Sequence, residues 1–346
     1  MKKVLIAVFW LVMFFLMGVA PTLQAADFEK ELSKAFINVP PDASNASMGN
    51  TWVATPFFGS NSAAVTAMGT YERGVVSLNY GVIDFEKGPD VQFYAPSALA
   101  KLPFGVLQFS YAAGNSDRKT FREEFSEEGW FSDDIEFGSI KEIDIQYGFK
   151  AGEKIFFEED KFYAGVGYNY GKSDIRFGSD ISTPATSFTA SLNSGTRSHT
   201  WSAGAVYQPS PLVSAGGFYA HSWDKTDDTF DFEGLAEEET NRSQSNQYRF
   251  GVGVQVTSST FVAADYQHLD LPSGNSDQFF AGVEQGIYKD SLYLYCGWAG
   301  DGPTTGIGMY FENGGLNVAY MHDTNDGLNK TLGKTKVVMV SAYLNF

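Results

Sequence analysis

The sequence of 346 residues has little of what several protein classes require. Its one cysteine, Cys296, excludes an internal disulfide framework and a cysteine-rich zinc site. With 24 Lys and Arg against 41 Asp and Glu, it has no surplus of cations to bind a nucleic-acid backbone. It also has only four histidines and no nucleophile elbow, phosphate-binding loop or zinc-protease motif. We therefore expect no enzyme activity, cofactor, bound metal or nucleic-acid partner.

The N-terminus has the pattern of an export signal. Lys2 and Lys3 precede an apolar run from Val4 to Val19, and the small residues Ala25 and Ala26 follow. The pattern predicts a secretory signal peptide over residues 1–25. The alternative is a retained anchor helix, although the run is shorter than the about 20 residues that cross a membrane. The exported chain is then soluble, or it crosses a membrane by strands.

Apolar residues alternate with polar or small residues in segment after segment. This period of two is typical of strands that are wet on one face and dry on the other. Aromatic residues, 16% of the chain, cluster toward the ends of these segments, as in membrane strands. The alternation predicts fourteen strands, at 74–85, 90–97, 104–113, 139–150, 161–176, 197–208, 211–223, 246–257, 260–270, 276–286, 291–299, 305–312, 315–323 and 335–346.

The connections between these strands distinguish a membrane barrel from a soluble β-sandwich. From the third strand onward every other connection is long, at 114–138, 177–196, 224–245 and 324–334, with short exceptions at 271–275 and 300–304. The intervening connections include very tight turns at 209–210, 258–259 and 313–314. An even number of strands, with long loops on one rim and short turns on the other, is typical of bacterial outer-membrane barrels. We therefore predict an all-β fold, an antiparallel transmembrane β-barrel of about 14 strands over residues 74–346, in the outer membrane of a Gram-negative bacterium.

The C-terminus carries a second barrel signal. Phe346 is the last residue of a segment whose apolar face continues through Leu344, Ala342 and Val340. This resembles the C-terminal signature that outer-membrane barrels present to their insertion machinery. The resemblance implies that machinery as a partner, recognised through Phe346.

Residues 26–73 precede the barrel and exceed what one anchor strand needs. Apolar residues from Phe28 to Phe36 have helical spacing, which predicts a short amphipathic helix before Pro40. The stretch from Asn45 to Met68 is rich in small residues and poor in charge, which favours an N-terminal plug inside the barrel. The alternative is a disordered periplasmic tail, although such tails are usually more charged.

The same region carries a family resemblance. The turn at 47–49 joins a small residue to Met and Gly, and Asn61 and Ser62 are followed by two alanines. With fourteen strands, a terminal Phe and the pattern of residues 279–324, the chain resembles the long-chain fatty-acid transporter (FadL-like) family. The resemblance implies a lumenal hatch that contains Asn45, Asn61, Ser62 and Ala63. In this chain Ser62 stands where the family's Asn-Pro-Ala motif has proline.

Charged and polar residues within strands are expected to face the lumen, because a charge facing lipid costs a few kcal/mol. They either hydrogen-bond to one another and stiffen the wall, or line a permeation path and hold the plug. Arg249 is suited to a lumenal ion pair, and several carboxylates are candidate partners. The lumenal candidates are Glu142, Asp144, Asn169, Arg249, Asp265 and Glu284.

Two of the predicted outer loops are acidic. Loop 114–138 has eight acidic and three basic residues, and loop 224–245 has eight and two. The acidic residues are either simply solvated, or they bind divalent cations that bridge lipopolysaccharide. Lipopolysaccharide and outer-membrane lipid are the predicted partners. Aromatic residues in these loops are costly to leave in water and are candidates for capturing a hydrophobic ligand. The candidates are Phe121, Phe125, Trp130, Phe230 and Phe232.

Together these features predict a channel for passive uptake of small hydrophobic molecules, with no cofactor. One alternative is a general diffusion porin that prefers cations because of its acidic mouth. Another is a barrel without transport activity that acts as a scaffold in surface assembly or secretion. A porin has an open lumen, a transporter has a plug with an apolar pocket, and a scaffold has a plug without one.

Overall fold

The structure is a computed structural model that describes thirteen stretches of the chain. These are residues 42–48, 50–54, 62–69, 73–86, 88–116, 118–126, 129–183, 186–232, 235–272, 274–288, 291–300, 302–322 and 334–346. The predicted signal peptide, the predicted helix over 28–36 and Asn61 lie outside these residues. Within them, no helix is long and apolar enough to cross a membrane.

Strands make up nearly all of the described chain. In chain order they are β1 (Gly74–Phe85), β2 (Val91–Leu102), β3 (Gly105–Ser116), β4 (Lys119–Ser126), β5 (Gly129–Glu153), β6 (Lys161–Thr183), β7 (Thr186–Ser210), β8 (Val213–Phe232), β9 (Leu235–Thr257), β10 (Thr260–Leu271), β11 (Gly274–Tyr288), β12 (Leu292–Ala299), β13 (Gly302–Phe311), β14 (Gly314–His322) and β15 (Thr335–Asn345).

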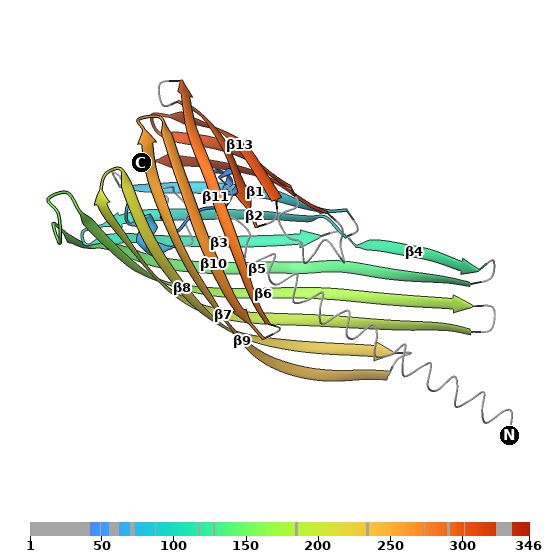
Figure 1. Ribbon diagram of the computed structural model, residues 1–346. Coiled ribbons are helices and arrows are strands. Elements are labelled where there is room, and N and C mark those ends of the chain that lie inside the picture. Colours follow the sequence, from blue (N-terminus) through green and yellow to red (C-terminus); the bar gives the residue numbers. More distant parts are fainter. Residues whose placement is uncertain are drawn as a thin grey trace.

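The strands form one closed antiparallel barrel (Figure 1). Except for β3 and β4, each strand pairs with its neighbour in sequence, and β15 pairs with β1 to close the ring. β3 and β4 both pair with β5 and occupy one position in the wall, so the described strands give fourteen positions. The prediction of a 14-stranded antiparallel barrel is confirmed. A closed ring leaves no strand edge unpaired, which a sheet in lipid requires.

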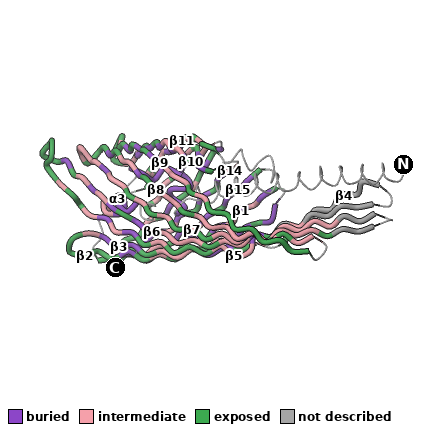
Figure 2. The backbone as a smooth tube through the Cα atoms, turned by 90° about the horizontal axis from the view of Figure 1, so that it is seen from below, coloured by how far each residue is buried: buried purple, intermediate pink, exposed green. Residues whose placement is uncertain are grey.

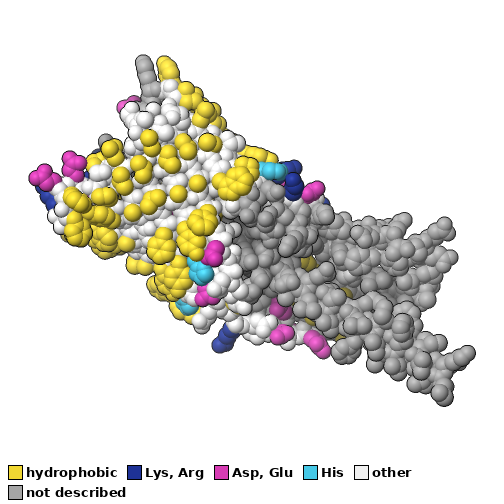
Figure 3. All heavy atoms as spheres, viewed as in Figure 1, with side chains coloured by type: hydrophobic (Ala, Val, Ile, Leu, Met, Phe, Trp, Pro, Cys, Tyr) yellow, Lys and Arg dark blue, Asp and Glu magenta, His cyan; other side chains and the backbone are white. Residues whose placement is uncertain are grey.

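The alternation of residues sorts side chains onto the two faces of the wall. In β9, Phe250, Val252 and Val256 are more than half exposed, whereas Arg249, next to Phe250, is 1% exposed. Hydrophobic side chains cover the middle of the wall, and charged ones gather near its edges (Figure 3). On this outward face, rings contact one another across strands, as Tyr168 does with Trp201 at 4.8 Å between centroids. This belt agrees with the aromatic girdles of membrane barrels.

Three of the four predicted long loops are wrong, because strands continue through much of 114–138, 177–196 and 224–245. The fourth, 324–334, lies outside the described residues except for its last residue. Strands β5 to β9 run on for 20 to 25 residues and project beyond the barrel as hairpins (Figures 1 and 2). β6 and β7 stay in register from Lys161 opposite Gln208 to Thr183 opposite Thr186. Two of the tight turns shift: one lies at 211–212 rather than 209–210, and another at 312–313 rather than 313–314. The turn at 258–259 is confirmed.

The described part of the N-terminal region contains two short helices, α2 (Ala43–Ser47) and α3 (Ala63–Thr66). Asp42 caps α2, because its Oδ1 accepts a hydrogen bond from the backbone N–H of Asn45 at 2.9 Å. Every residue of both helices is buried. α2 contacts strands β12 to β15 and α3 contacts β5 to β7, so the two helices lie inside the barrel against different parts of its wall.

Candidate functional site

A buried ion pair in the lumen connects the wall to the N-terminal region. Arg249 of β9 donates from Nε to Oδ2 of Asp265 of β10 at 3.0 Å, and both side chains are at most 1% exposed. The same Asp265 oxygen accepts hydrogen bonds from the backbone N–H groups of Trp52 at 2.9 Å and Val53 at 3.2 Å. Asp265 therefore joins residues 52–53 to the barrel wall.

The Arg249 side chain makes further contacts with the same segment. It donates from Nη2 to the carbonyl oxygen of Asn50 and from Nη1 to Oε1 of Gln267 at 3.2 Å. Its guanidinium carbon lies 4.5 Å from the ring centre of Trp52 and 4.1 Å from that of Phe280. The two aromatic faces and the paired carboxylate compensate the buried guanidinium for the water that it loses. We call residues 50–53 with Arg249 and Asp265 the latch.

Hydrogen bonds attach the rest of the segment around the circumference. The backbone N–H of Ala43 donates to Oγ of Ser341 in β15 at 2.7 Å, and Thr304 of β13 donates to the carbonyl of Ser47 at 2.8 Å. Ser214 of β8 donates to the carbonyl of Ala54 at 2.6 Å. Thr66 of α3 donates to Oε1 of Gln108 in β3 at 3.2 Å. The segment is therefore bonded to opposite parts of the wall.

Glycines on the inner face allow the segment to approach the wall. A Cβ added to Gly216 would lie 2.5 Å from the carbonyl oxygen of Val53, and one added to Gly204 would lie 2.5 Å from Oγ of Ser62. Additions at Gly148, Gly165, Gly282 and Gly306 would also overlap atoms of the segment. Glycine within a strand often marks a close backbone approach of this kind.

Helix α2 packs against a buried apolar cluster in the lumen, to which its Ala43 and Ala46 contribute. Phe85 of β1 and Phe137 of β5 are at most 1% exposed, and their ring centres lie 5.9 Å apart. We call the whole set the apolar cluster; its buried members are Ala43, Ala46, Ile83, Phe85, Val91, Phe137, Ile175, Phe280, Ala299, Ala319, Met321, Val337 and Met339.

The predicted lumenal residues fall into separate groups. Arg249 and Asp265 meet, as described above. Glu142, Asp144 and Asn169 lie together on β5 and β6, where Asn169 donates from Nδ2 to Oε1 of Glu142 and is the ladder partner of Asp144. Glu284 lies apart from both groups, opposite Tyr295 of β12.

The predicted plug and capture residues have different outcomes. Asn45 is fully buried in α2, Ser62 is the N-cap residue of α3 and Ala63 is its first residue. The capture candidates lie on strands rather than in loops, which corrects the expectation for these residues. Phe121 and Phe125 are in β4, Trp130 is in β5, and Phe230 and Phe232 are near the end of β8. Of these side chains the structure describes only the last two, and Phe230 is 38% exposed.

Several functional contacts were not predicted. Asp42, Ser214, Thr304 and Ser341 were missed because Asp, Ser and Thr at these positions are common in any barrel. The inward glycines did carry a signal, since they recur every second residue on the predicted lumenal face, as at Gly251 and Gly253. That pattern indicates a second backbone against the wall without identifying it.

The fold has close counterparts among solved structures, although no family model and no curated protein sequence matches the chain. The toluene transporter TbuX of Ralstonia pickettii is 11% identical, with 90% of this chain and 100% of that chain covered and a TM-score of 0.62. A FadL homologue of Pseudomonas aeruginosa is 12% identical, with 89% and 99% covered and a TM-score of 0.58. The toluene transporter TodX of Pseudomonas putida is 12% identical, with the same coverage and a TM-score of 0.54. The resemblance to FadL-like barrels is thus confirmed at the level of the fold: the chain has the closed antiparallel β-barrel fold of these structures.

Proposed function

We propose that the protein is an outer-membrane channel for passive uptake of small hydrophobic molecules, and that residues 26–73 act as its plug. The observation that carries the proposal is a buried N-terminal segment inside the lumen, in contact with a buried apolar cluster. An open diffusion porin needs neither feature. The similar structures named as toluene transporters and as a FadL homologue support the same class.

The apolar cluster supplies the chemistry that a hydrophobic ligand needs. An apolar molecule gains about 25 cal/mol for each Å² of its surface that leaves water. Aromatic side chains such as Phe85 and Phe137 add a face on which a flat ligand packs. No cofactor or energy source enters this scheme, because the ligand moves down its own concentration gradient.

Release toward the periplasm requires the segment to move. Ala43 and Ala46 of α2 form part of the apolar cluster, and α2 is bonded to β13 and β15. A ligand that occupies the cluster competes with these alanines for the same apolar surface. Displacement of α2 then opens a path past the latch.

The test measures binding of an apolar fluorescent dye, N-phenylnaphthylamine, and its displacement by toluene and by palmitate. Phe85→Ala removes a ring from the apolar cluster and is expected to weaken dye binding about tenfold, because the loss of about 60 Å² of apolar contact costs about 1.5 kcal/mol at 25 cal/mol per Å². The matched control is Phe279→Ala, whose ring is 69% exposed on the outward face. It is expected to leave dye binding unchanged.

Planar-bilayer conductance separates the alternatives. The full-length protein is expected to be silent, and deletion of residues 26–70 to produce steady conductance. Salt-dependent conductance of the intact protein would favour a cation-preferring porin. Silence together with no dye binding would favour a scaffold.

A further inference from the structure

Five basic side chains form a continuous row across five neighbouring strands. The ladder places each residue directly opposite the next, from β5 to β9. Because ladder partners share a face and adjacent strands lie about 4.8 Å apart, the row is about 19 Å long. We call this set the basic row; it consists of Lys141, Lys172, Arg197, Lys225 and Arg242.

The basic row lies on the outward face, just beyond the aromatic belt. On β6, β7 and β8, the position two residues closer to the membrane centre is occupied by Tyr170, His199 and Trp223, which are ladder neighbours. The ring centres of Tyr170 and His199 are 5.1 Å apart. On β7, ten residues separate Arg197 from Tyr207 near the opposite rim, and a tilted strand crosses a membrane in about 9–11 residues. The row is therefore placed where lipid tails end and headgroups begin.

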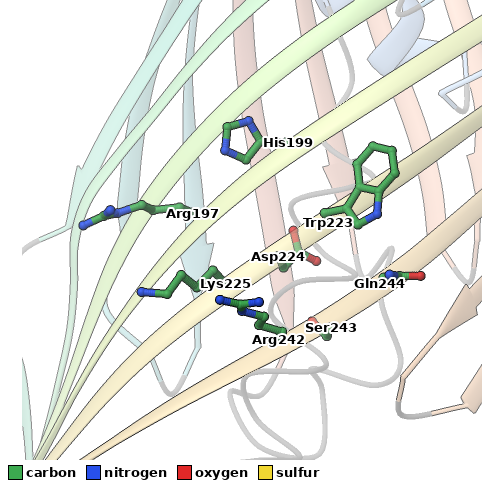
Figure 4. Close-up of a pocket in the computed structure, with 8 residues that line it drawn as sticks. All are labelled: Arg197, His199, Trp223, Asp224, Lys225, Arg242, Ser243 and Gln244. Atoms are coloured by element: carbon green, nitrogen blue, oxygen red, sulfur yellow. The ribbon is translucent and has the colours of Figure 1, made fainter.

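A groove of about 600 Å³ runs along the middle of the row. Arg197, Lys225 and Arg242 line it from three adjacent strands, and Figure 4 shows their charged ends on the same side. His199 and Trp223 line its membrane side. Gln244 and Ser243 also border the groove, as does Asp224, whose ladder partner is Ser198 of the inner face.

Carboxylates neutralise only part of the row. Lys172 pairs with Asp174 at 3.4 Å and Lys225 pairs with Asp227 at 2.7 Å, both on the side away from the membrane. Among the described residues, Lys141, Arg197 and Arg242 form no ion pair, although the charge of Arg197 also helps to lower the pKa of Asp227. The basic row therefore keeps an excess of positive charge, although the net charge of the whole chain is −17.

We propose that the basic row and its groove bind the phosphate groups of lipopolysaccharide in the outer leaflet. Guanidinium groups hold phosphate oxygens through paired hydrogen bonds, and lysines add charge. Trp223 and His199 offer flat faces for the sugar that carries the phosphate. A phosphate held at the level of the aromatic belt, on the lipid-facing side, belongs to a lipid rather than to a permeating solute. The inference uses the outer-membrane location of the proposed function but not its transport activity.

The test compares two triple variants for binding of bisphosphorylated lipid A in detergent micelles. One combines Arg197→Ala, Lys225→Ala and Arg242→Ala. The matched control removes three exposed lysines near the opposite rim, with Lys101→Ala, Lys150→Ala and Lys161→Ala. Because each cation near an anionic lipid surface contributes roughly fivefold, the first variant is expected to bind about 100-fold more weakly, and the control to bind as the parent does.

Two further measurements complete the test. Lipid A without phosphates is expected to bind the parent and the first variant equally weakly, and inorganic phosphate is expected not to compete. Equal binding of bisphosphorylated lipid A by all three proteins would overturn the proposal, as would competition by micromolar inorganic phosphate, which would indicate a site for free phosphate. Heat-modifiable electrophoretic mobility verifies that each variant is folded. Binding of N-phenylnaphthylamine reports on the lumen in a separate assay. Failure of the transport proposal would therefore appear in dye binding and not in lipid A binding.

Discussion

Removal of the Asp265 carboxylate is predicted to open the channel. The substitution Asp265→Ala leaves Arg249, with a side chain 1% exposed, without its counter-charge. It also removes the acceptor for the backbone N–H groups of Trp52 and Val53. These losses fall on the docked segment, because the barrel strands keep their own backbone hydrogen bonds.

The size of the effect follows from these contacts. Breaking a buried ion pair by deleting one partner costs about 3–5 kcal/mol, and each buried N–H without an acceptor costs about 1–3 kcal/mol. Because these costs overlap, they do not add in full. We therefore take about 4 kcal/mol, less than their sum, for the destabilisation of the docked segment. By the rule that 1.4 kcal/mol is tenfold, the ratio of open to closed channels rises about a thousandfold.

The assay is single-channel conductance in a planar bilayer. The matched control is Asp277→Ala, because Asp277 of β11 is also a hydrogen-bonded aspartate, accepting from Tyr266 at 2.6 Å and His268 at 2.7 Å, but it is 57% exposed. We expect frequent openings for the first variant and none for the control. Folded Asp265→Ala protein that stays as silent as the parent would refute the role of the latch. Equal opening by both variants would show that the effect is not specific to the latch.

A double variant distinguishes loss of the latch contacts from the stranded charge. Arg249→Met combined with Asp265→Leu removes both charges and fills their space with apolar atoms. Replacing a buried pair in this way usually costs less than breaking it. We expect fewer openings than for Asp265→Ala alone, and a double-mutant cycle gives the coupling energy.

Three further predictions concern other contacts. Gly282→Val would overlap the Met48 carbonyl and is expected to displace α2 and raise conductance, whereas Gly171→Val, with only Ser198 near at 3.7 Å, stays silent in the same assay. Desolvation raises the pKa of Asp160, but the N–H groups of residues 155–157 and the Tyr207 hydroxyl outweigh it and hold that pKa below its usual 3.8. The charged carboxylate therefore stabilises turn 154–160 above pH about 3.8, and this contribution disappears as the pH falls through the lowered pKa. The part of the amide-shift titration of the turn that Asp160→Asn removes is expected to have its midpoint below that pH; a midpoint above 3.8 for that part would contradict the sign. Phe137→Ala is expected to weaken N-phenylnaphthylamine binding as Phe85→Ala does, because the two rings are in contact, and unchanged affinity would exclude this part of the cluster.

The alternation of residues determined the barrel. Side chains of a strand point to opposite faces regardless of what lies around them, so the pattern from Tyr248 to Val256 indicates a membrane strand by itself. The same local rule predicted the belt aromatics on the outward face and the position of Arg249 on the inward face. It failed for the hairpins beyond the membrane because both of their faces meet water. A polar stretch such as 224–245 therefore has no apolar face to reveal that it is a strand.

Partnership across the lumen was decided only by the tertiary structure. Several carboxylates were candidates for Arg249, and the pairing with Asp265 depends on the register between β9 and β10 and on the segment that supplies Asn50, Trp52 and Val53. The basic row likewise exists only because five registers bring distant residues into line. Such contacts join residues far apart in the chain, whereas periodicity records only which face each residue takes. The sequence alone therefore determined the strands of the barrel wall, whereas only the tertiary structure determined the contacts of the wall with residues 50–53 and the alignment of the basic row.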